Sequence, residues 1–421
     1  NTFKKSVGII YCIKYFELVI ELNSFIKFTM AEKAYITPNV FKWARESARI
    51  SEETAASKVS VSLERFKRWE AGSSQPTIKQ AQTLAKAYKR PFAIFFLPDI
   101  PRDFQPLQDF RKNGSKSLST SSIFIIREIR QKQSWISEMN EENNERKLPF
   151  VGKFSFKDNP EKVAADILET LNITPSKYET ENPIKEWISK SEAKGIFVSR
   201  TSFIHSKLKL DSEELQGFAI ADPYAPFVFI NSDDWNAPQL FTLVHELAHI
   251  WIAETGISND VEPNLKNNNK LHPIELFCNE VAANALIPKD YIRGLDKTIF
   301  ENSKEVFKAS KILGVSSFAF LVRAFNLDLI SLSVYQDLKK EAEKDFKDFL
   351  KREAEKKARQ KIKDNPGGPS YYLLQLNRNS RLFTQTVLDA FHGGVIEPTQ
   401  ASNLLNVRIN KFQKLETQLY K

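Results

Sequence analysis

The residues best suited to chemistry form the pentapeptide His245-Glu246-Leu247-Ala248-His249. Residues four apart share one face of a helix, so His245 and His249 can offer ring nitrogens to a single metal ion. Glu246 stands beside the first histidine, where it can take a proton from an activated water instead of binding the metal. The flanking residues are apolar, as expected for a helix that crosses a core. The alternative interpretation is a pair of core histidines next to a surface glutamate.

A catalytic zinc site needs a third protein ligand and one open position. Residues 273–288 have the pattern of a second amphipathic helix, with Pro273 in its first turn. Glu275 lies one turn inside it in an apolar run, and a buried carboxylate is costly unless it is paired or metal-bound. Glu280 is a competitor on another face, and His272 is a further candidate because residues three apart can converge on one ion. The spacing alone leaves this choice open.

The elements that would position these residues follow from capping and periodicity. Three short apolar segments, 196–200, 217–222 and 226–231, are predicted to be strands directly before the metal helix. Helices are predicted over 123–140, 159–171 and 184–193. A small sheet beside a metal helix is the minimal architecture of a zincin peptidase, so the predicted fold class is α+β and mostly helical.

The N-terminal region is predicted to contain five short helices over residues 38–98. The segment 51–71 has the proportions of a helix-turn-helix, whose second helix enters the major groove of DNA. The side chains predicted to contact DNA lie on that second helix or at its N-terminus, where backbone amides can meet phosphates. They are Ser60, Ser62, Arg65, Lys67 and Arg68. The alternative is a plain helical bundle with a basic exterior.

Charge is unevenly distributed along the chain of 421 residues. The net charge is +9, with twelve Lys/Arg against six Asp/Glu in residues 30–97 and six against thirteen in residues 200–290. The basic region suits an anionic partner such as DNA, whereas the metal region is acidic. The length predicts about two to four domains.

The cysteine pattern and the first residues bear on the compartment. Cys12 and Cys278 lie far apart in the sequence, so no disulfide framework is expected and a reducing cytoplasm is the predicted location. Met30 looks like a translation start, and residues 1–29 are interpreted as an upstream extension without an assigned role. The apolar stretch 7–13 is too short for a membrane span.

The segment Phe66–Gln80 resembles the XRE (Cro/repressor-type) DNA-binding family, with its Trp-Glu and Pro-Thr pairs after the second helix. Segments Lys89–Pro98 and Asp109–Arg111 are similar to the form of that domain fused to zinc peptidases of the ImmA/IrrE type. The resemblance implies binding to double-stranded operator DNA.

Phe241–His249 and Ile274–Asn279 likewise resemble the zinc-binding blocks of the ImmA/IrrE family, although Ala248 replaces the commoner glycine. In that family a leading glutamate completes the zinc site, and it falls on Glu275. The resemblance therefore implies Zn²⁺ held by His245, His249 and Glu275, with Glu246 as general base in peptide-bond hydrolysis. His272 could lie behind the ligands or donate to the oxyanion, and the alternative is a helix-cap histidine. Cys278 is expected in the core.

Beyond the metal region, helices are predicted over 305–313, 317–325, 335–363, 378–392, 398–405 and 409–419. The resulting domain prediction is an extension (1–29), a helix-turn-helix domain (30–98), a linker with a helix (99–158), a zinc metallopeptidase domain (159–330), a long charged helix (331–364) and a helical accessory domain (365–421).

The resemblance implies a DNA-binding regulator with a zinc endopeptidase that cleaves a repressor-type protein. The competing hypothesis is a regulator or antitoxin-like module whose metal domain senses or scaffolds without cutting, and a third is cleavage of its own chain or of a partner at the operator. Glu246 favours the enzyme, because a structural site needs no general base. The expected partners are operator DNA, a repressor-type substrate and a second copy in a homodimer, with no membrane.

Overall fold

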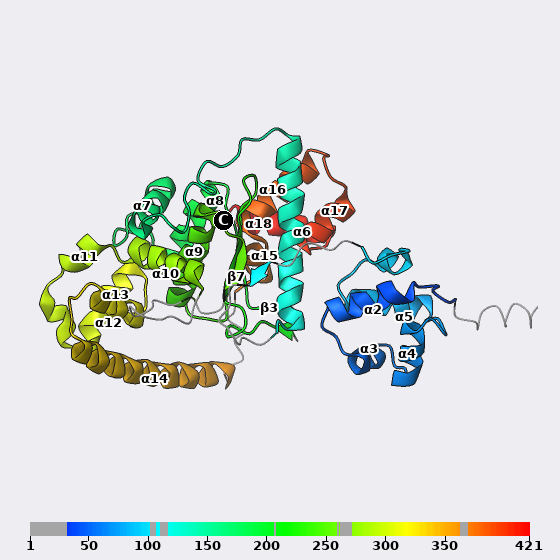
Figure 1. Cartoon of the computed structure of the whole chain (residues 1–421), viewed down its shortest axis with the longest axis horizontal. Helices are drawn as coiled ribbons and strands as arrows, with labels where there is room; N and C mark the ends of the chain where they lie inside the picture. Colours follow the sequence, from blue (N-terminus) through cyan, green and yellow to red (C-terminus); the bar gives the residue numbers. More distant parts are fainter. Residues whose placement is uncertain are drawn as a thin grey trace, which may run out of the picture. The chain divides into compact units, whose positions relative to one another are not determined.

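The computed structural model describes residues 32–101, 107–109, 117–205, 208–258, 261, 272–362 and 369–421. The predictions for residues 1–30, for Phe110 and Arg111 and for residues 363–368 lie outside these ranges. The chain divides into two compact units, residues 1–104 and residues 105–421, which are treated separately below. The fold is α+β and mostly helical, which confirms the predicted class (Figure 1).

Unit 1 is all-helical in its described part. Its elements are α2 (Pro38–Ser47), α3 (Glu52–Lys58), α4 (Leu63–Glu70), α5 (Ile78–Ala87) and the 3-10 helix η1 (Phe92–Phe96). Ser51 and Ser62 cap α3 and α4 through their hydroxyls, and Thr77 forms a capping box with Gln80 at α5. Gly72 ends α4 at a φ of +76°.

Unit 1 is held together by an aromatic core and one buried ion pair. Phe41 lies at the centre, with its ring 5.9 Å from Phe66 and 5.0 Å from Phe95. The guanidinium of Arg45 on α2 donates to both carboxylate oxygens of Glu70 on α4, at 2.7 and 2.9 Å. This bidentate pair fixes α4 against α2.

Unit 2 is built on a five-stranded mixed sheet with the order β1-β7-β5-β6-β2. Its strands are β1 (Gln108–Asp109), β2 (Phe197–Thr201), β5 (Gly217–Ile220), β6 (Phe227–Asn231) and β7 (Gly256–Ser258), and β3 (Phe203–His205) pairs separately with β4 (Leu208–Lys209). β5 is antiparallel to both of its neighbours, which places Gly217 between Ile230 and Ser258.

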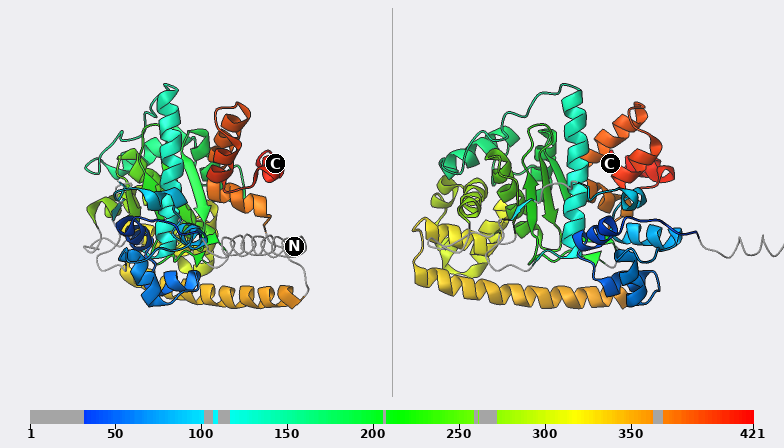
Figure 2. Two further views of the ribbon diagram at one scale, coloured as in Figure 1. Left: turned by 90° about the vertical axis from the view of Figure 1, so that its right-hand side faces the viewer. Right: turned by 45° about the vertical axis from the view of Figure 1, so that its right-hand side comes forward.

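Helices cover both faces of this sheet. The helices of unit 2 are α6 (Thr120–Glu142), α7 (Pro160–Leu171), α8 (Pro183–Ala193), α9 (Asn236–Trp251), α10 (Pro273–Leu286), α11 (Lys289–Arg293), η2 (Lys297–Glu301), α12 (Ser303–Leu313), α13 (Ser317–Asn326), α14 (Leu332–Ile362), α15 (Tyr371–Asn379), α16 (Arg381–His392), α17 (Pro398–Leu405), η3 (Ile409–Lys411) and α18 (Phe412–Leu419). Figures 1 and 2 show α9 and α10 on one face and α6 with α15 and α16 on the other. Every residue of α9 from Gln239 to Trp251 is buried.

The C-terminal helices differ from the prediction. Residues 378–392 were expected to form one helix, but the chain breaks at Ser380, whose φ is +74°, and α15 precedes the break. The Ser380 hydroxyl accepts from the amide of Phe383 and donates to Glu192 on α8 at 2.5 Å. The break is therefore stabilised by a contact with α8, which is distant in the sequence. The local periodicity of residues 378–392 could not predict it. Among the described helices, none is long and apolar enough to cross a membrane.

Candidate metal centre

Three buried side chains from α9 and α10 converge at one point. The Nε2 atoms of His245 and His249 are 3.1 Å apart, and they lie 3.2 and 3.1 Å from the two carboxylate oxygens of Glu275. Ligand atoms around a tetrahedral zinc, at about 2.0–2.2 Å from the ion, are about 3.3–3.5 Å apart. The triangle therefore has nearly the size that this ion requires, and its two nitrogens and one carboxylate are ligands that zinc accepts.

The electrostatics of the triangle also suit a cation. Burial lowers the pKa of His245, which keeps the imidazole neutral near pH 7. Asn279 Oδ1 lies 2.9 Å from His245 Nδ1 and accepts its proton, so the lone pair of Nε2 points into the triangle. Burial would raise the pKa of Glu275, but its interactions with His245 and then His249 outweigh the burial and lower the pKa to about 2. The site thus presents an ionised carboxylate beside two ring nitrogens.

Glu246 is fully buried beside the triangle and is not one of its corners. Among the described residues, neither of its carboxylate oxygens has a hydrogen-bond partner. Burial raises its pKa well above the usual range and the charge of Glu275 raises it further, while the nearby Ser258 hydroxyl lowers it. Ser258 makes its own hydrogen bond to Glu275, at 3.4 Å. An unpartnered buried carboxyl is expected where a group is kept for proton transfer.

Strand β5 passes beside the Glu246 carboxylate at Gly217. A Cβ added at Gly217 would lie 2.9 Å from Glu246 Oε1 and 2.7 Å from the Cγ2 of Thr242. These are closer approaches than real side chains make, so glycine is required for the strand to pass directly beside the carboxylate.

Comparison with known proteins bears on this half of the molecule. Residues 191–325 match the Peptidase_M78 family, the IrrE N-terminal-like domain. The match runs from the end of α8 to α13 and contains all four residues of the site. The chain thus carries a metallopeptidase-type domain of this kind over about a third of its length. ComR from Streptococcus suis, a solved structure, is 13% identical in sequence to this chain. The match covers 93% of this chain and 96% of that chain, with a TM-score of 0.13. No curated protein matches the chain.

Other residues singled out in the sequence lie elsewhere. His272 caps α10 by accepting from the amide of Ile274 at 3.3 Å, it is exposed, and it is outside the triangle. The structure thus gives it the helix-cap position. Glu280 is exposed on α10, and Cys278 is buried in the core, as predicted.

Three residues of the site were missed by the sequence analysis. Asn279 stands four residues after Glu275, and this spacing could have indicated that it shares the face of the ligand. Ser258 and Gly217 carry no comparable signal, because they reach the site only through strand pairing.

The predicted DNA-contacting side chains of unit 1 lie on α4 or in the turn before it. Ser60, Ser62, Arg65, Lys67 and Arg68 are all exposed, whereas Phe66 and Trp69 of the same helix are buried. Ser62 caps the N-terminus of α4, and Ser60 lies in the turn before it with a φ of +53°. Lys67 lies 3.5 Å from Glu52 on α3.

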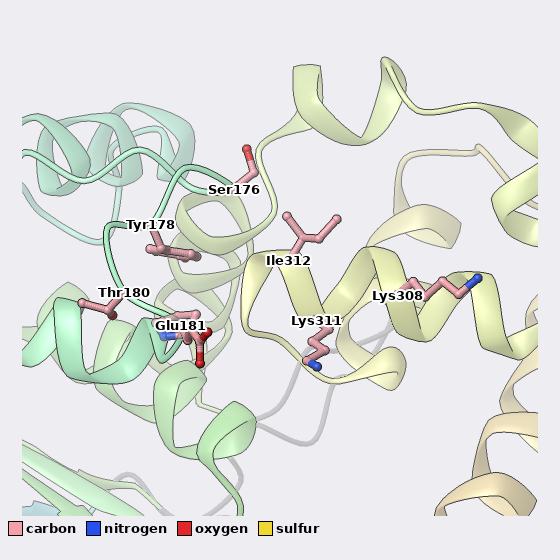
Figure 3. A pocket seen from close by; sticks show the side chains of 8 residues that line it. Ser176, Tyr178, Thr180, Glu181, Lys308, Lys311 and Ile312 are labelled. Atoms are coloured by element: carbon pink, nitrogen blue, oxygen red, sulfur yellow. The ribbon is translucent and has the colours of Figure 1, made fainter.

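A surface pocket of about 420 Å³ lies between the segment before α8 and helix α12 (Figure 3). None of its lining residues belongs to the metal site. The Tyr178 hydroxyl at its wall donates to the carbonyl of Leu313 at 3.2 Å and accepts from the indole N–H of Trp187 at 3.3 Å, which braces the loop. Lys308 and Lys311 on its rim are exposed to solvent. The pocket therefore offers no buried charged group that would bind a ligand.

Proposed function

We propose that the protein is a DNA-binding regulator whose second unit is a zinc-dependent endopeptidase, and that its substrate is a repressor-type regulatory protein. The observation that carries the proposal is the buried triangle of His245, His249 and Glu275 with the unpartnered carboxyl of Glu246 beside it. A structural zinc site is closed by a fourth protein ligand and has no use for an adjacent base.

His245, His249 and Glu275 would hold the ion. Zinc bound there would supply Lewis acidity, which lowers the pKa of a water and polarises a carbonyl. Glu246 takes the proton from the attacking water and passes it to the leaving amine. Its burial serves this role, because a carboxyl with a raised pKa accepts a proton more readily than an exposed one. Asn279 keeps the proton of His245 on Nδ1.

Metal analysis and two kinds of variant test the site. The purified protein should hold about one zinc per chain, and the zinc should be lost in His245→Ala and Glu275→Ala but kept in Glu246→Gln. Normal zinc content in Glu275→Ala would remove this residue from the ligand set.

Cleavage is tested in cells that produce candidate repressors, beginning with one encoded next to this protein. Wild type should remove the repressor, whereas Glu246→Gln should leave it intact while still binding zinc. If the two behave alike, the metal domain is a sensor or scaffold and the peptidase proposal fails.

The proposal for unit 1 is that α4 reads operator DNA. Its support is the exposure of the basic side chains Arg65, Lys67 and Arg68 on a helix whose N-terminus is capped by Ser62. Replacing these three residues by alanine should abolish operator binding. The matched control removes the same charge from Lys79, Lys86 and Lys89, which are exposed on and after α5. Equal losses in both variants would show that the effect is general charge and not the surface of α4.

A further inference from the structure

Strand β1 covers one edge of the sheet in unit 2. Gln108 and Asp109 pair in parallel with Gly256 and Ile257 of β7, and β1 is the last strand on this side of the described sheet. Figure 1 shows it as a short cyan arrow beside β7. Unit 1 ends at residue 104, only four positions before β1 begins. The segment of the chain that follows unit 1 therefore covers this edge.

The strand beneath β1 is the one that contacts the metal ligands. Ser258, the last residue of β7, is buried and donates to Glu275 Oε1 at 3.4 Å. The inner edge of β7 is taken by β5, where Ser258 pairs with Gly217 beside the Glu246 carboxylate. Neighbouring strands lie about 4.8 Å apart. A strand on the outer edge of β7 therefore runs within a few ångströms of the metal triangle and the base.

An extended peptide is the ligand that suits such an edge. The outer edge of a strand presents backbone N–H and C=O groups, and a peptide that adds as a further strand pairs with them. Under the function proposed above, the substrate has to present its backbone to the metal, and this edge leads there. β1 runs toward Ser258 and pairs as far as Ile257, one position before it. A peptide and β1 cannot use the backbone groups of Gly256 and Ile257 at the same time.

β1 is held by few contacts of its own. Both of its residues are exposed, and Leu107 directly before it is the one buried side chain of residues 107–109, at 8% exposure. Two residues also make few ladder hydrogen bonds. However, a segment tethered to the same chain is present at an effective concentration on the order of millimolar. A free peptide therefore has to compete with a neighbour that is weakly bound but always present.

We propose that β1 is a built-in competitor of the substrate strand. While residues 107–109 lie on the outer edge of β7, a peptide cannot reach the metal along this edge, and unit 2 is inhibited by its own chain. When β1 leaves, the edge becomes free for the substrate. The shortness and exposure of β1 favour this role over that of a permanent strand, because Leu107 is the single buried side chain that these residues contribute. The inference rests on the peptidase function proposed above.

Peptide binding to the full-length chain tests the competitor. The parent chain carries Glu246→Gln and is loaded with zinc, so that the probe is bound but not cut. The probe is a fluorescein-labelled peptide with the sequence of residues 105–111, followed by anisotropy. Gln108→Pro combined with Asp109→Pro removes both backbone N–H groups of β1. This variant should bind the probe at least tenfold more tightly than the parent chain. Equal affinity in the two chains overturns the proposal.

Matched variants separate strand pairing from other effects. Gln108→Ser combined with Asp109→Asn keeps both N–H groups and should bind the probe as weakly as the parent chain. Leu107→Ala should tighten binding by less than the double proline variant, because it removes only the buried anchor. A probe with proline at positions 108 and 109 should not bind. The double proline variant should retain its zinc, since neither residue is a corner of the triangle. If this variant holds zinc but binds no probe, the edge does not accept a peptide and the proposal is wrong.

Cleavage in cells distinguishes this proposal from the peptidase proposal. With Glu246 intact, the double proline variant should remove the repressor faster than wild type. If the probe binds as expected but no chain cleaves a repressor, the peptidase proposal fails and the competitor is supported. If both chains cleave at the same rate and bind the probe equally, the peptidase proposal holds and the competitor is refuted.

Discussion

Single atoms decide how the metal ligands are presented, and Asn279 is the clearest case. Its Oδ1 accepts the Nδ1 proton of His245 at 2.9 Å and thereby fixes the tautomer that exposes Nε2. Asn279→Ala should weaken zinc binding about 10–100-fold, measured by competition with a chromogenic chelator. Asn279→Asp, which can accept the same proton, should retain most of the affinity. Unchanged affinity in the alanine variant would mean that packing alone orients His245; Glu280→Ala, at the exposed next residue, is the control.

Gly217 contributes to the site because it has no side chain, which leaves room for the Glu246 carboxylate. In Gly217→Ala the new methyl group would lie 2.9 Å from Glu246 Oε1 and 3.0 Å from the carbonyl of Phe229, so the carboxylate must move. We expect a loss of about 1–3 kcal/mol in stability, with zinc content unchanged, because Glu246 is not a corner of the triangle. Repressor cleavage in cells should fall to the level of Glu246→Gln. Gly294→Ala, at an exposed glycine, should change none of these readouts.

The sequence predicted the parts of the site that lie on one element. His245 and His249 meet because helical geometry alone puts them on one face. The choice of Glu275 over Glu280 and His272 depended on resemblance, because the approach of α10 to α9 is a tertiary contact. Gly217 and Ser258 could not be assigned to the site from the sequence. The pairing of β5 with β7 joins residues about forty positions apart, so it leaves no local sequence pattern.

Among helices and strands, the longer elements were predicted correctly from the sequence and the shortest strands were missed. The mostly helical α+β class was correct because capping residues and periodicity mark helices such as α6 and α7 clearly. Strands β1 and β7 were missed, since two and three residues are too few to show an alternating pattern. The position of these strands is set by pairing, β7 with β5 and β1 with β7.

A buried ionic cluster fastens α15 to α6. Glu128 accepts from Lys132 at 2.9 Å and from Arg378 at 3.1 and 2.5 Å. Burial would raise the Glu128 pKa, but the two cations outweigh it and lower the pKa to about 2. A carboxyl whose pKa falls on folding stabilises the fold above its unfolded pKa, near 4.5, and that stabilisation is lost as the pH falls toward 2.

Glu128→Gln should therefore destabilise unit 2 by roughly 2–3 kcal/mol at pH 7, because it leaves two buried cations without their carboxylate. Denaturant unfolding at a series of pH values should show the wild-type and variant stabilities converging between about pH 4.5 and 2. Glu141→Gln, at an exposed position on the same helix, should follow wild type throughout. A constant difference across this range would show that Glu128 contributes through packing and not through its charge.

At the scale of the whole molecule, the chain is two compact units with different sources of stability. The described part of unit 1 depends on the Phe41 cluster and the Arg45–Glu70 pair, which need no ligand. Unit 2 buries Glu246 and Glu275 together beside two imidazoles, and two neighbouring buried carboxyl groups destabilise a fold unless a cation or a proton compensates them. A metal should therefore stabilise one unit and leave the other unaffected.

Metal removal tests this division. A chelator should lower the melting temperature of unit 2 by about 10 °C, since a ligand at a thousand times its Kd contributes about 4 kcal/mol to the folded state. Hydrogen exchange should become faster in α9 and α10 and stay unchanged in α2 to α5. His245→Ala should melt like the metal-free wild type and should not respond to the chelator. An equal rise in the hydrogen-exchange rates of both units would mean that the metal also stabilises unit 1. The aromatic packing of Phe41 with Phe66 and Phe95 does not require a metal.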